Sequence, residues 1–373
     1  MADRVIISSD SHVVEPPNLW LERMDRKYGD RIPHLVKGVP YDHWYCDGLG
    51  VGAIGIFSMA GLRFENPGEI TSDGSYANVP AGGYDPHAHV ADLDIDKVKA
   101  DVIYPSIGLN MYAGMDGTFI REVFSAYNDW LDEFCKVYPD RLKGIAMILL
   151  DDDIGKGIEE LRRAHSMGMC GAMISVFPRV GETYDHPDYD QFWEEAQSLD
   201  MPISLHNGTK RASNELTQAS EKVQFTGAEF VNRDHWVRMS ISHIVLSGVF
   251  ERYPDLKIVN VEHELAWIPY FIRRLDVAYL ERSSQTNYRF KGSNLPSDMM
   301  RSNVYHSFQD DELGIRDRHD IGVDKLLWAS DYPHAESTFP KSQAILEEIL
   351  EGIPENEKNM IVAENTAKLY KFN

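Results

Sequence analysis

The chain has 373 residues, of which 43% are hydrophobic and 26% are charged, and its formal net charge is −22. This is an ordinary globular composition, while the excess of acidic residues argues against nucleic acid or an anionic membrane surface as a partner. Three scattered cysteines offer neither a disulfide framework nor a zinc knuckle, and no apolar run approaches the roughly 20 residues of a membrane span. We therefore expect a cytoplasmic protein that acts on a small molecule.

Short β-rich runs alternate with helical patterns along the chain. The predicted strands are Val5–Ser8, Val102–Tyr104, Gly144–Ile148, Ala172–Val176, Pro202–His206, Lys257–Val261, Asn303–His306 and Lys325–Trp328. Between them, apolar residues at helical spacing predict helices over Phe119–Tyr138, Ile154–Met167, Tyr189–Leu199, Trp267–Leu280 and Gln343–Leu350. Strands that alternate with helices pair in parallel through crossover connections. Eight such units favour a single (β/α)₈ TIM barrel over residues 1–373, with an open, doubly wound sheet as the alternative.

Two segments interrupt this alternation. Pro33–Ala88 follows the first strand, is rich in Gly, Pro, Tyr and Asp, and has no strong helical period. Thr209–Arg238 follows the fifth strand. Both leave the C-terminal end of a strand, so we expect both to lie over the mouth of the barrel. There, long insertions shape a substrate pocket or a subunit contact.

Metal-ligating residue types follow several predicted strands, and strand ends form the mouth of a TIM barrel. Asp10 and His12 are two apart after the first strand, so their side chains share a face. His206 ends the fifth strand, and Asp331 follows the eighth in Trp328-Ala329-Ser330-Asp331. Imidazole and carboxylate together suit zinc, iron and manganese. We predict a divalent metal on Asp10, His12, His206 and Asp331, with zinc preferred over manganese or iron.

Further polar residues lie near the same strand ends. His263 follows the sixth strand beside Glu262 and is predicted to be the catalytic acid or base, with Asp331 as a second proton carrier. Glu262, His263 and His306 are also considered as additional ligands. Among the remaining candidates, Glu264 is either a helix cap or a residue in or beside the ligand set, and Glu15 is a cap or loop residue. His243 is assigned to helix packing, and His87 and His89 to a helix start. His235 is considered for the mouth, but that role is not the favoured one.

These residues lie in motifs that resemble the amidohydrolase superfamily. The motifs are Ser9-Asp10-Ser11-His12-Val13-Val14-Glu15-Pro16, Leu246-Ser247-Gly248-Val249-Phe250-Glu251-Arg252-Tyr253-Pro254-Asp255-Leu256-Lys257, Trp267-Ile268-Pro269-Tyr270 and Trp328-Ala329-Ser330-Asp331-Tyr332-Pro333-His334. The chain resembles more narrowly the amidohydrolase-2 group related to aminocarboxymuconate semialdehyde decarboxylase and γ-resorcylate decarboxylase. The resemblance implies a (β/α)₈ barrel, one catalytic divalent metal and a homodimer.

The resemblance places the family's first-strand pair on Asp10 and His12, its fifth-strand histidine on His206, its catalytic histidine on His263 and its last aspartate on Asp331. Many members of the superfamily have His-x-His where this chain has Asp10-x-His12. No lysine stands at Ser175, where a bridging ligand of a dinuclear site would be expected.

Three functions remain open on these grounds. The first is a metal-dependent hydrolase or non-oxidative decarboxylase of a small carboxylated, aromatic or cyclic compound. The second is a non-haem diiron oxygenase on the same barrel, in which Glu262, Glu264 and His306 complete a second metal site. The third is a non-catalytic binding protein on an inherited barrel. Aromatic residues in Pro33–Ala88 favour an aromatic ligand.

Overall fold

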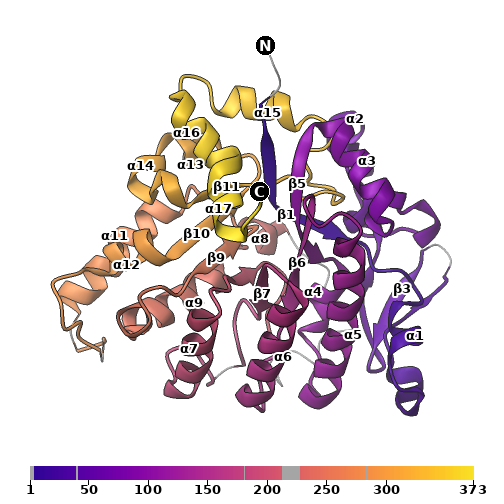
Figure 1. The fold of residues 1–373 in the computed structure, drawn as a ribbon, viewed down its shortest axis with the longest axis horizontal. Coiled ribbons are helices and arrows are strands. Elements are labelled where there is room, and N and C mark those ends of the chain that lie inside the picture. Colours follow the sequence, from indigo (N-terminus) through magenta and orange to yellow (C-terminus); the bar gives the residue numbers. More distant parts are fainter. Residues whose placement is uncertain (1–3, 39–40, 180, 212–226, 283, 287) are drawn as a thin grey trace.

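The computed structural model describes residues 4–38, 41–179, 181–211, 227–282, 284–286 and 288–373. Eight parallel strands lie side by side in the order β1, β5, β6, β7, β8, β9, β10, β11, with helices around them (Figure 1). Their bounds are β1 (Ile6–Val13), β5 (Val98–Pro105), β6 (Leu142–Met147), β7 (Gly171–Ile174), β8 (Ile203–His206), β9 (Ile258–Val261), β10 (Val304–Phe308) and β11 (Leu326–Trp328). All eight predicted strands are confirmed, and the fold is the expected (β/α)₈ barrel.

The first and last strands meet at a seam that brings the two ends of the chain together. The backbone N–H of Asp331 donates to the carbonyl of Asp10 at 2.9 Å, and the N–H of His12 donates to the carbonyl of Tyr332 at 2.6 Å. These two hydrogen bonds close the barrel just beyond the end of β11, beside the residues of the predicted site.

The predicted helices are present, with ends shifted by at most a few residues. Helix α5 starts where the Asp116 carboxylate accepts from the N–H of Phe119, and α6 ends at Gly168, which adopts a left-handed conformation (φ 100°). The described α-helices are α1 (Leu19–Arg23), α2 (Leu62–Glu65), α3 (Pro86–Asp96), α4 (Ile107–Met111), α5 (Gly117–Lys136), α6 (Ile154–Met167), α7 (Asp190–Ser198), α8 (Gly227–Val231), α9 (His235–Leu246), α10 (Val249–Arg252), α11 (Ile268–Glu281), α12 (Pro296–Asn303), α13 (Glu312–Arg316), α14 (Arg318–Ile321), α15 (Ser342–Ile349), α16 (Glu355–Asn359) and α17 (Asn365–Tyr370).

The segment from Pro33 to Ala88 forms a small antiparallel sheet of β2 (His34–Val36), β3 (His43–Cys46) and β4 (Leu49–Ala53), followed by short helical turns. The N–H of Ala335 donates to the carbonyl of Ile56 at 2.7 Å, and the N–H of Ala60 donates to the carbonyl of Pro333 at 3.0 Å. The insertion thus contacts the loop that follows β11, at the C-terminal mouth. Its role as a lid or a subunit contact stays a prediction.

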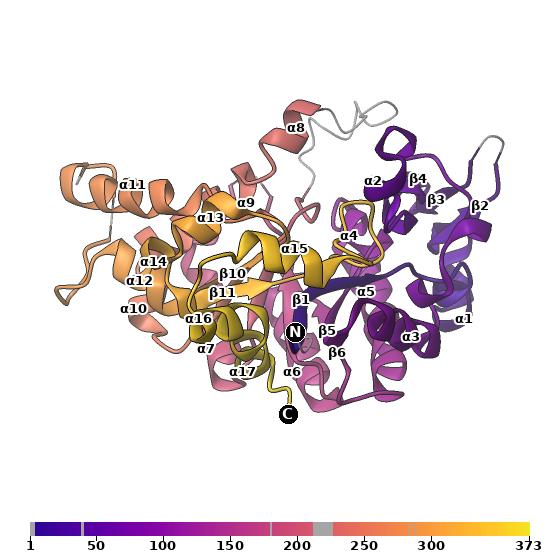
Figure 2. The ribbon, with the colours of Figure 1, turned by 90° about the horizontal axis from the view of Figure 1, so that it is seen from above.

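The other predicted mouth segment, Thr209–Arg238, is described only in part, because residues 212–226 lie outside the described residues. Figure 2 shows its helix α8 on the same side of the barrel as α2 of the insertion. Arg211 is buried, and its guanidinium pairs with the carboxylate of Asp151.

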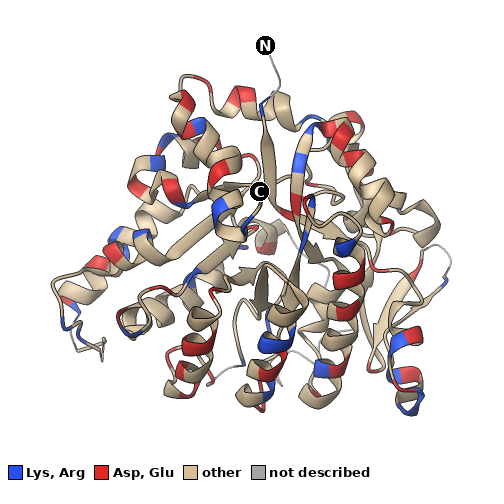
Figure 3. Ribbon diagram, viewed as in Figure 1, with Lys and Arg blue, Asp and Glu red and all other residues tan. Residues whose placement is uncertain are grey.

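Acidic residues are spread over the outer helices (Figure 3), in keeping with the net charge of −22. Within the described part of the chain, none of the helices is both long enough and apolar enough to cross a membrane.

Candidate active site

Four of the predicted ligands converge at the mouth of the barrel. Nε2 of His12 lies 3.3 Å from Oδ1 of Asp10 and 3.1 Å from Oδ1 of Asp331. Nε2 of His206 lies 3.4 Å from the same Asp10 oxygen. All four side chains are buried. Strands β1 and β8 and the turn after β11 therefore bring together side chains that are far apart in the sequence.

Backbone carbonyls fix the tautomers of both histidines. Nδ1 of His12 lies 2.8 Å from the carbonyl oxygen of Pro105, and Nδ1 of His206 lies 2.8 Å from that of Asn207. Because a carbonyl oxygen only accepts hydrogen bonds, Nδ1 carries the proton in each ring. In the neutral rings both Nε2 lone pairs then point toward the carboxylates.

This arrangement of acceptors fits a bound cation. Both oxygens of Asp10, Oδ1 of Asp331, and Nε2 of His12 and His206 are buried with no hydrogen-bond partner. Lone pairs that face carboxylate oxygens at such distances need a positive charge between them, and two imidazoles with two carboxylates suit a divalent ion. Two sets whose ligand atoms all lie within 4.8 Å of one another are Asp10, His12 and His206, and His12, Asp331 and His334.

The electrostatics of the cluster agree with its geometry. Burial raises the pKa of Asp331, but His334 and His12 more than offset it, so that the pKa lies well below the usual range. Burial lowers the pKa of His12, yet Asp10 and Asp331 outweigh it and hold that pKa well above its usual value. The carboxylates are therefore ionised and create a site that attracts positive charge.

His334 also belongs to the cluster, although it was not among the predicted site residues. Its Nδ1 lies 3.0 Å from Oδ1 of Asp331, and its ring stacks on that of His12 at 3.8 Å. It falls three residues after Asp331 in the quoted motif, beyond a Tyr-Pro turn, and that position is the signal that could have identified it. Asp331 itself has a positive φ of 57°, a strained conformation of the kind found at functional sites.

His263 lies beside the cluster with both ring nitrogens buried and unpartnered. Burial, together with His206 and Arg233, lowers its pKa well below the usual value. The imidazole of the free protein is therefore neutral. An unpaired, buried, neutral imidazole next to a cation site is a group that can exchange a proton with a bound molecule.

Glu262 and Glu264 flank His263, and both have positive φ. Oε2 of Glu262 lies 3.5 Å from Nδ1 of His206, and its Oε1 lies 3.5 Å from Nη1 of Arg233. Burial raises the pKa of Glu262 to about 7, while His206 lowers it. Glu264 accepts from the N–H of Gln309 at 3.3 Å. Neither glutamate belongs to the two candidate ligand sets.

His306, considered as an additional ligand, is not brought to the cluster. Strand β10 continues to Phe308, so His306 does not end the strand as expected. It pairs in register with Leu326 and Asn260, one residue deeper than His206, and its Nδ1 lies 3.3 Å from Nδ2 of Asn260. Burial lowers its pKa to about 3, so it is a neutral side chain packed inside the barrel.

The other candidate residues have structural partners. Glu15 caps α4, because its two oxygens accept from the N–H groups of Ile107 and Gly108, each at 2.9 Å. His243 lies in α9 as expected, and His87 and His89 lie in the first turn of α3. His235 begins α9 and packs against the ring of Trp236.

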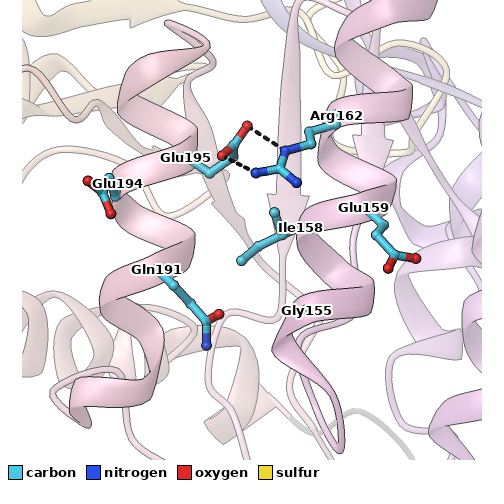
Figure 4. A pocket seen from close by; sticks show the side chains of 7 residues that line it. All are labelled: Gly155, Ile158, Glu159, Arg162, Gln191, Glu194 and Glu195. Atoms are coloured by element: carbon cyan, nitrogen blue, oxygen red, sulfur yellow. Dashed lines mark hydrogen bonds and ion pairs between the residues drawn. The ribbon is translucent and has the colours of Figure 1, made fainter.

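A groove between α6 and α7 lies outside this cluster (Figure 4). Arg162 and Glu195 form a two-pronged ion pair across it, at 2.8 and 2.7 Å. Its lining residues include none of the candidate ligands, so we do not assign the active site to this groove.

Comparison with known proteins shows to which family the chain belongs. A family model described as amidohydrolase matches residues 115–372, well over half of the chain. The chain belongs to this family. The γ-resorcylate decarboxylase of Polaromonas sp. is 26% identical over 277 residues, which cover 69% of this chain and 79% of that relative. The predicted resemblance is thus confirmed, and the protein is an enzyme.

Solved structures agree on the fold. An amidohydrolase from Mycobacterium avium subsp. paratuberculosis K-10 superimposes with a TM-score of 0.79 at 20% identity, covering 99% of this chain and 98% of that one. A dihydroxybenzoic acid decarboxylase from Polaromonas sp., with bound manganese and the inhibitor 2-nitroresorcinol, gives 0.66 at 19% identity, covering 99% and 98%. Decarboxylases among the relatives favour the first of the three functions over the oxygenase.

Proposed function

We propose that this amidohydrolase is a divalent-metal-dependent, non-oxidative decarboxylase of a small aromatic carboxylate. The proposal rests on five buried atoms that could bind a metal and have no hydrogen-bond partner. They are carboxylate oxygens of Asp10 and Asp331 and Nε2 of His12 and His206. The γ-resorcylate decarboxylases among its relatives support a substrate with a carboxylate on an aromatic ring.

Asp10, His12, His206 and Asp331 would hold the ion. When bound there, a divalent ion would supply Lewis-acid chemistry to the substrate. Manganese is supported by the manganese-bound relative, and zinc by the imidazole-rich ligand set. Two carboxylates balance the charge of one divalent ion, so a bound substrate anion would meet no excess of negative charge from the ligands.

His263 would manage the proton. The reaction adds a proton to the ring carbon that carries the carboxylate, and the bond to that carboxylate then breaks with release of carbon dioxide. Burial keeps His263 neutral in the free enzyme. An anionic substrate beside it favours the imidazolium form, so His263 takes up its proton as the substrate binds and gives it to the ring carbon.

The test uses metal-loaded enzyme and a panel that begins with 2,6-dihydroxybenzoate. We expect carbon dioxide release without oxygen, and in D₂O one deuterium at the vacated ring carbon. Turnover that requires oxygen would contradict the proposal and favour the oxygenase. Hydrolysis of an ester or amide in the panel, without decarboxylation, would favour the hydrolase.

A homodimer is also proposed, from the family resemblance alone, and its measurement is sedimentation of the purified enzyme. A cytoplasmic location stays a prediction.

A further inference from the structure

His334 touches two of the proposed ligands and is held in turn by a third element of the barrel. Its ring stacks on His12 with centroids 3.8 Å apart, and its Nδ1 lies 3.0 Å from Oδ1 of Asp331. On the other side, its Nε2 lies 2.8 Å from the hydroxyl of Ser106, directly after β5. All four side chains are buried.

These contacts hold the ring of His334 from two sides. Nδ1 of His334 lies beside Oδ1 of Asp331, an oxygen that has no hydrogen-bond partner in the structure. Nε2 of His334 and the hydroxyl of Ser106 share a hydrogen bond, in which the tautomer of the ring decides which atom donates. The pair therefore fixes the direction of the Asp331 carboxylate, on a residue whose positive φ needs support from its surroundings.

The loop that carries His334 is in turn held by the insertion. Backbone hydrogen bonds join Ala335 to Ile56 and Pro333 to Ala60. The ring of Phe57 packs against the ring of His334, with centroids 5.1 Å apart and planes inclined at 53°. Because aromatic pairs are favourable at this separation, the contact with Phe57 helps to hold the ring of His334 in place.

The guanidinium of Arg63 adds a further tie. Its Nη1 donates to the carbonyl of Glu336 at 2.9 Å, and its Nη2 donates to Oδ2 of Asp310 at 2.9 Å. The insertion therefore binds the loop on both sides of His334, at Pro333 and at Ala335 and Glu336. None of these hydrogen bonds involves the side chain of Phe57.

We propose that His334 is a positioning residue for the metal ligands, and that the insertion sets its position through Phe57. This inference rests on the proposed metal site. It makes the insertion a part of the site's architecture: a side chain that touches no ligand controls how tightly the ion is held.

The experiment measures the affinity of the full-length, metal-free protein for Mn²⁺, from the electron paramagnetic resonance signal of the free ion. The variants are His334→Ala, His334→Asn, Phe57→Ala and Phe57→Leu. Ile56→Ala is the matched control, because its side chain is exposed and its backbone hydrogen bond is retained. Circular dichroism and the melting temperature of each metal-free variant check the fold.

We expect His334→Ala to weaken Mn²⁺ binding about 10- to 100-fold, as removal of an outer partner of a ligand does. His334→Asn, which keeps a polar group beside Asp331, should lie between wild type and His334→Ala. Phe57→Ala should weaken binding about 3- to 30-fold. Phe57→Leu, which keeps the bulk but not the aromatic ring, should lie between wild type and Phe57→Ala, while Ile56→Ala stays near wild type. One ion per chain should remain in every variant, with a melting temperature close to wild type.

Other results would overturn the inference in recognisable ways. Loss of the ion from both His334 variants would make His334 a ligand. Equal affinity in His334→Ala and wild type would make it a packing residue, and equal affinity in Phe57→Ala would remove the insertion from the site. If wild type itself binds no divalent ion, the proposed function fails together with the inference.

Discussion

Nε2 of His12, on the first strand, lies 3.1 Å from Oδ1 of Asp331, just beyond the last strand. Neighbouring main-chain bonds hold the two residues in place, since Asp331 donates to the carbonyl of Asp10 and His12 donates to the carbonyl of Tyr332. The seam that closes the barrel is therefore also the place where the proposed ligands meet. A change that opens the seam should disturb fold and metal binding together.

Metal removal should abolish activity. We expect a chelator to reduce turnover by at least about 100-fold, and one equivalent of Mn²⁺ or Zn²⁺ per chain to restore it. His206→Ala, which removes an unpartnered donor, should not recover with added metal. His186→Ala is the control, because that histidine is exposed and belongs to neither candidate ligand set. Elemental analysis gives the number of metal ions per chain, and two irons per chain would contradict the mononuclear site.

Loss of the His263 imidazole should slow the chemistry while sparing the metal. His263→Asn removes a proton carrier, and general acid–base groups contribute about 100- to 10,000-fold to turnover. We expect kcat to fall in that range, with the metal content of wild type. Steady-state kinetics measures kcat, and elemental analysis of the same samples measures the metal content. An unchanged kcat would exclude His263 as the proton donor.

Asp96 should make stability depend on pH. This carboxyl, 4% exposed at the end of α3, accepts from the N–H of Ser342 at 3.0 Å. Burial raises its pKa from 3.8 to about 6. A raised carboxyl pKa favours the protonated folded form, so this stabilisation is complete below pH 3.8 and is lost as the pH rises through 6. The difference amounts to about 2–3 kcal/mol.

The comparison of Asp96→Asn with wild type isolates this effect. Urea unfolding should show the variant gaining stability relative to wild type between pH 5 and pH 8. Asp94→Asn, at an exposed position on the same helix, is the control. A constant difference between Asp96→Asn and wild type across this range would contradict the assignment.

A side chain at Gly82 should destabilise the fold. A Cβ there would lie 2.3 Å from the hydroxyl of Tyr332, whose ring cannot swing away as a flexible chain can. Tyr332 also donates to Asp92 and is adjacent to Asp331. We expect Gly82→Ala to cost about 1–3 kcal/mol. Thermal unfolding measures this, and Gly68→Ala, at a position with open space, should be near neutral.

The sequence by itself determined the barrel and most of the proposed site. Helical spacing of apolar residues and short β-rich runs reflect local geometry, so they located all eight strands and the long helices. Because the C-terminal ends of parallel strands form one mouth, residues after strands could be grouped without knowing any distance. Asp10, His12, His206 and Asp331 were grouped in this way.

The tertiary structure alone decided which neighbours join them. Strand register placed His306 one residue too deep, since a side chain's depth depends on pairing that a sequence pattern does not specify. The contacts of His334 with Ser106 and Phe57 join segments from three parts of the chain. The small sheet of the insertion was not predicted, because β2 and β4 contain no buried residue and so lack the apolar run that marks the barrel strands. Such long-range contacts form only when the chain is folded, and so the sequence indicates the proposed ligands but not the contacts that hold them.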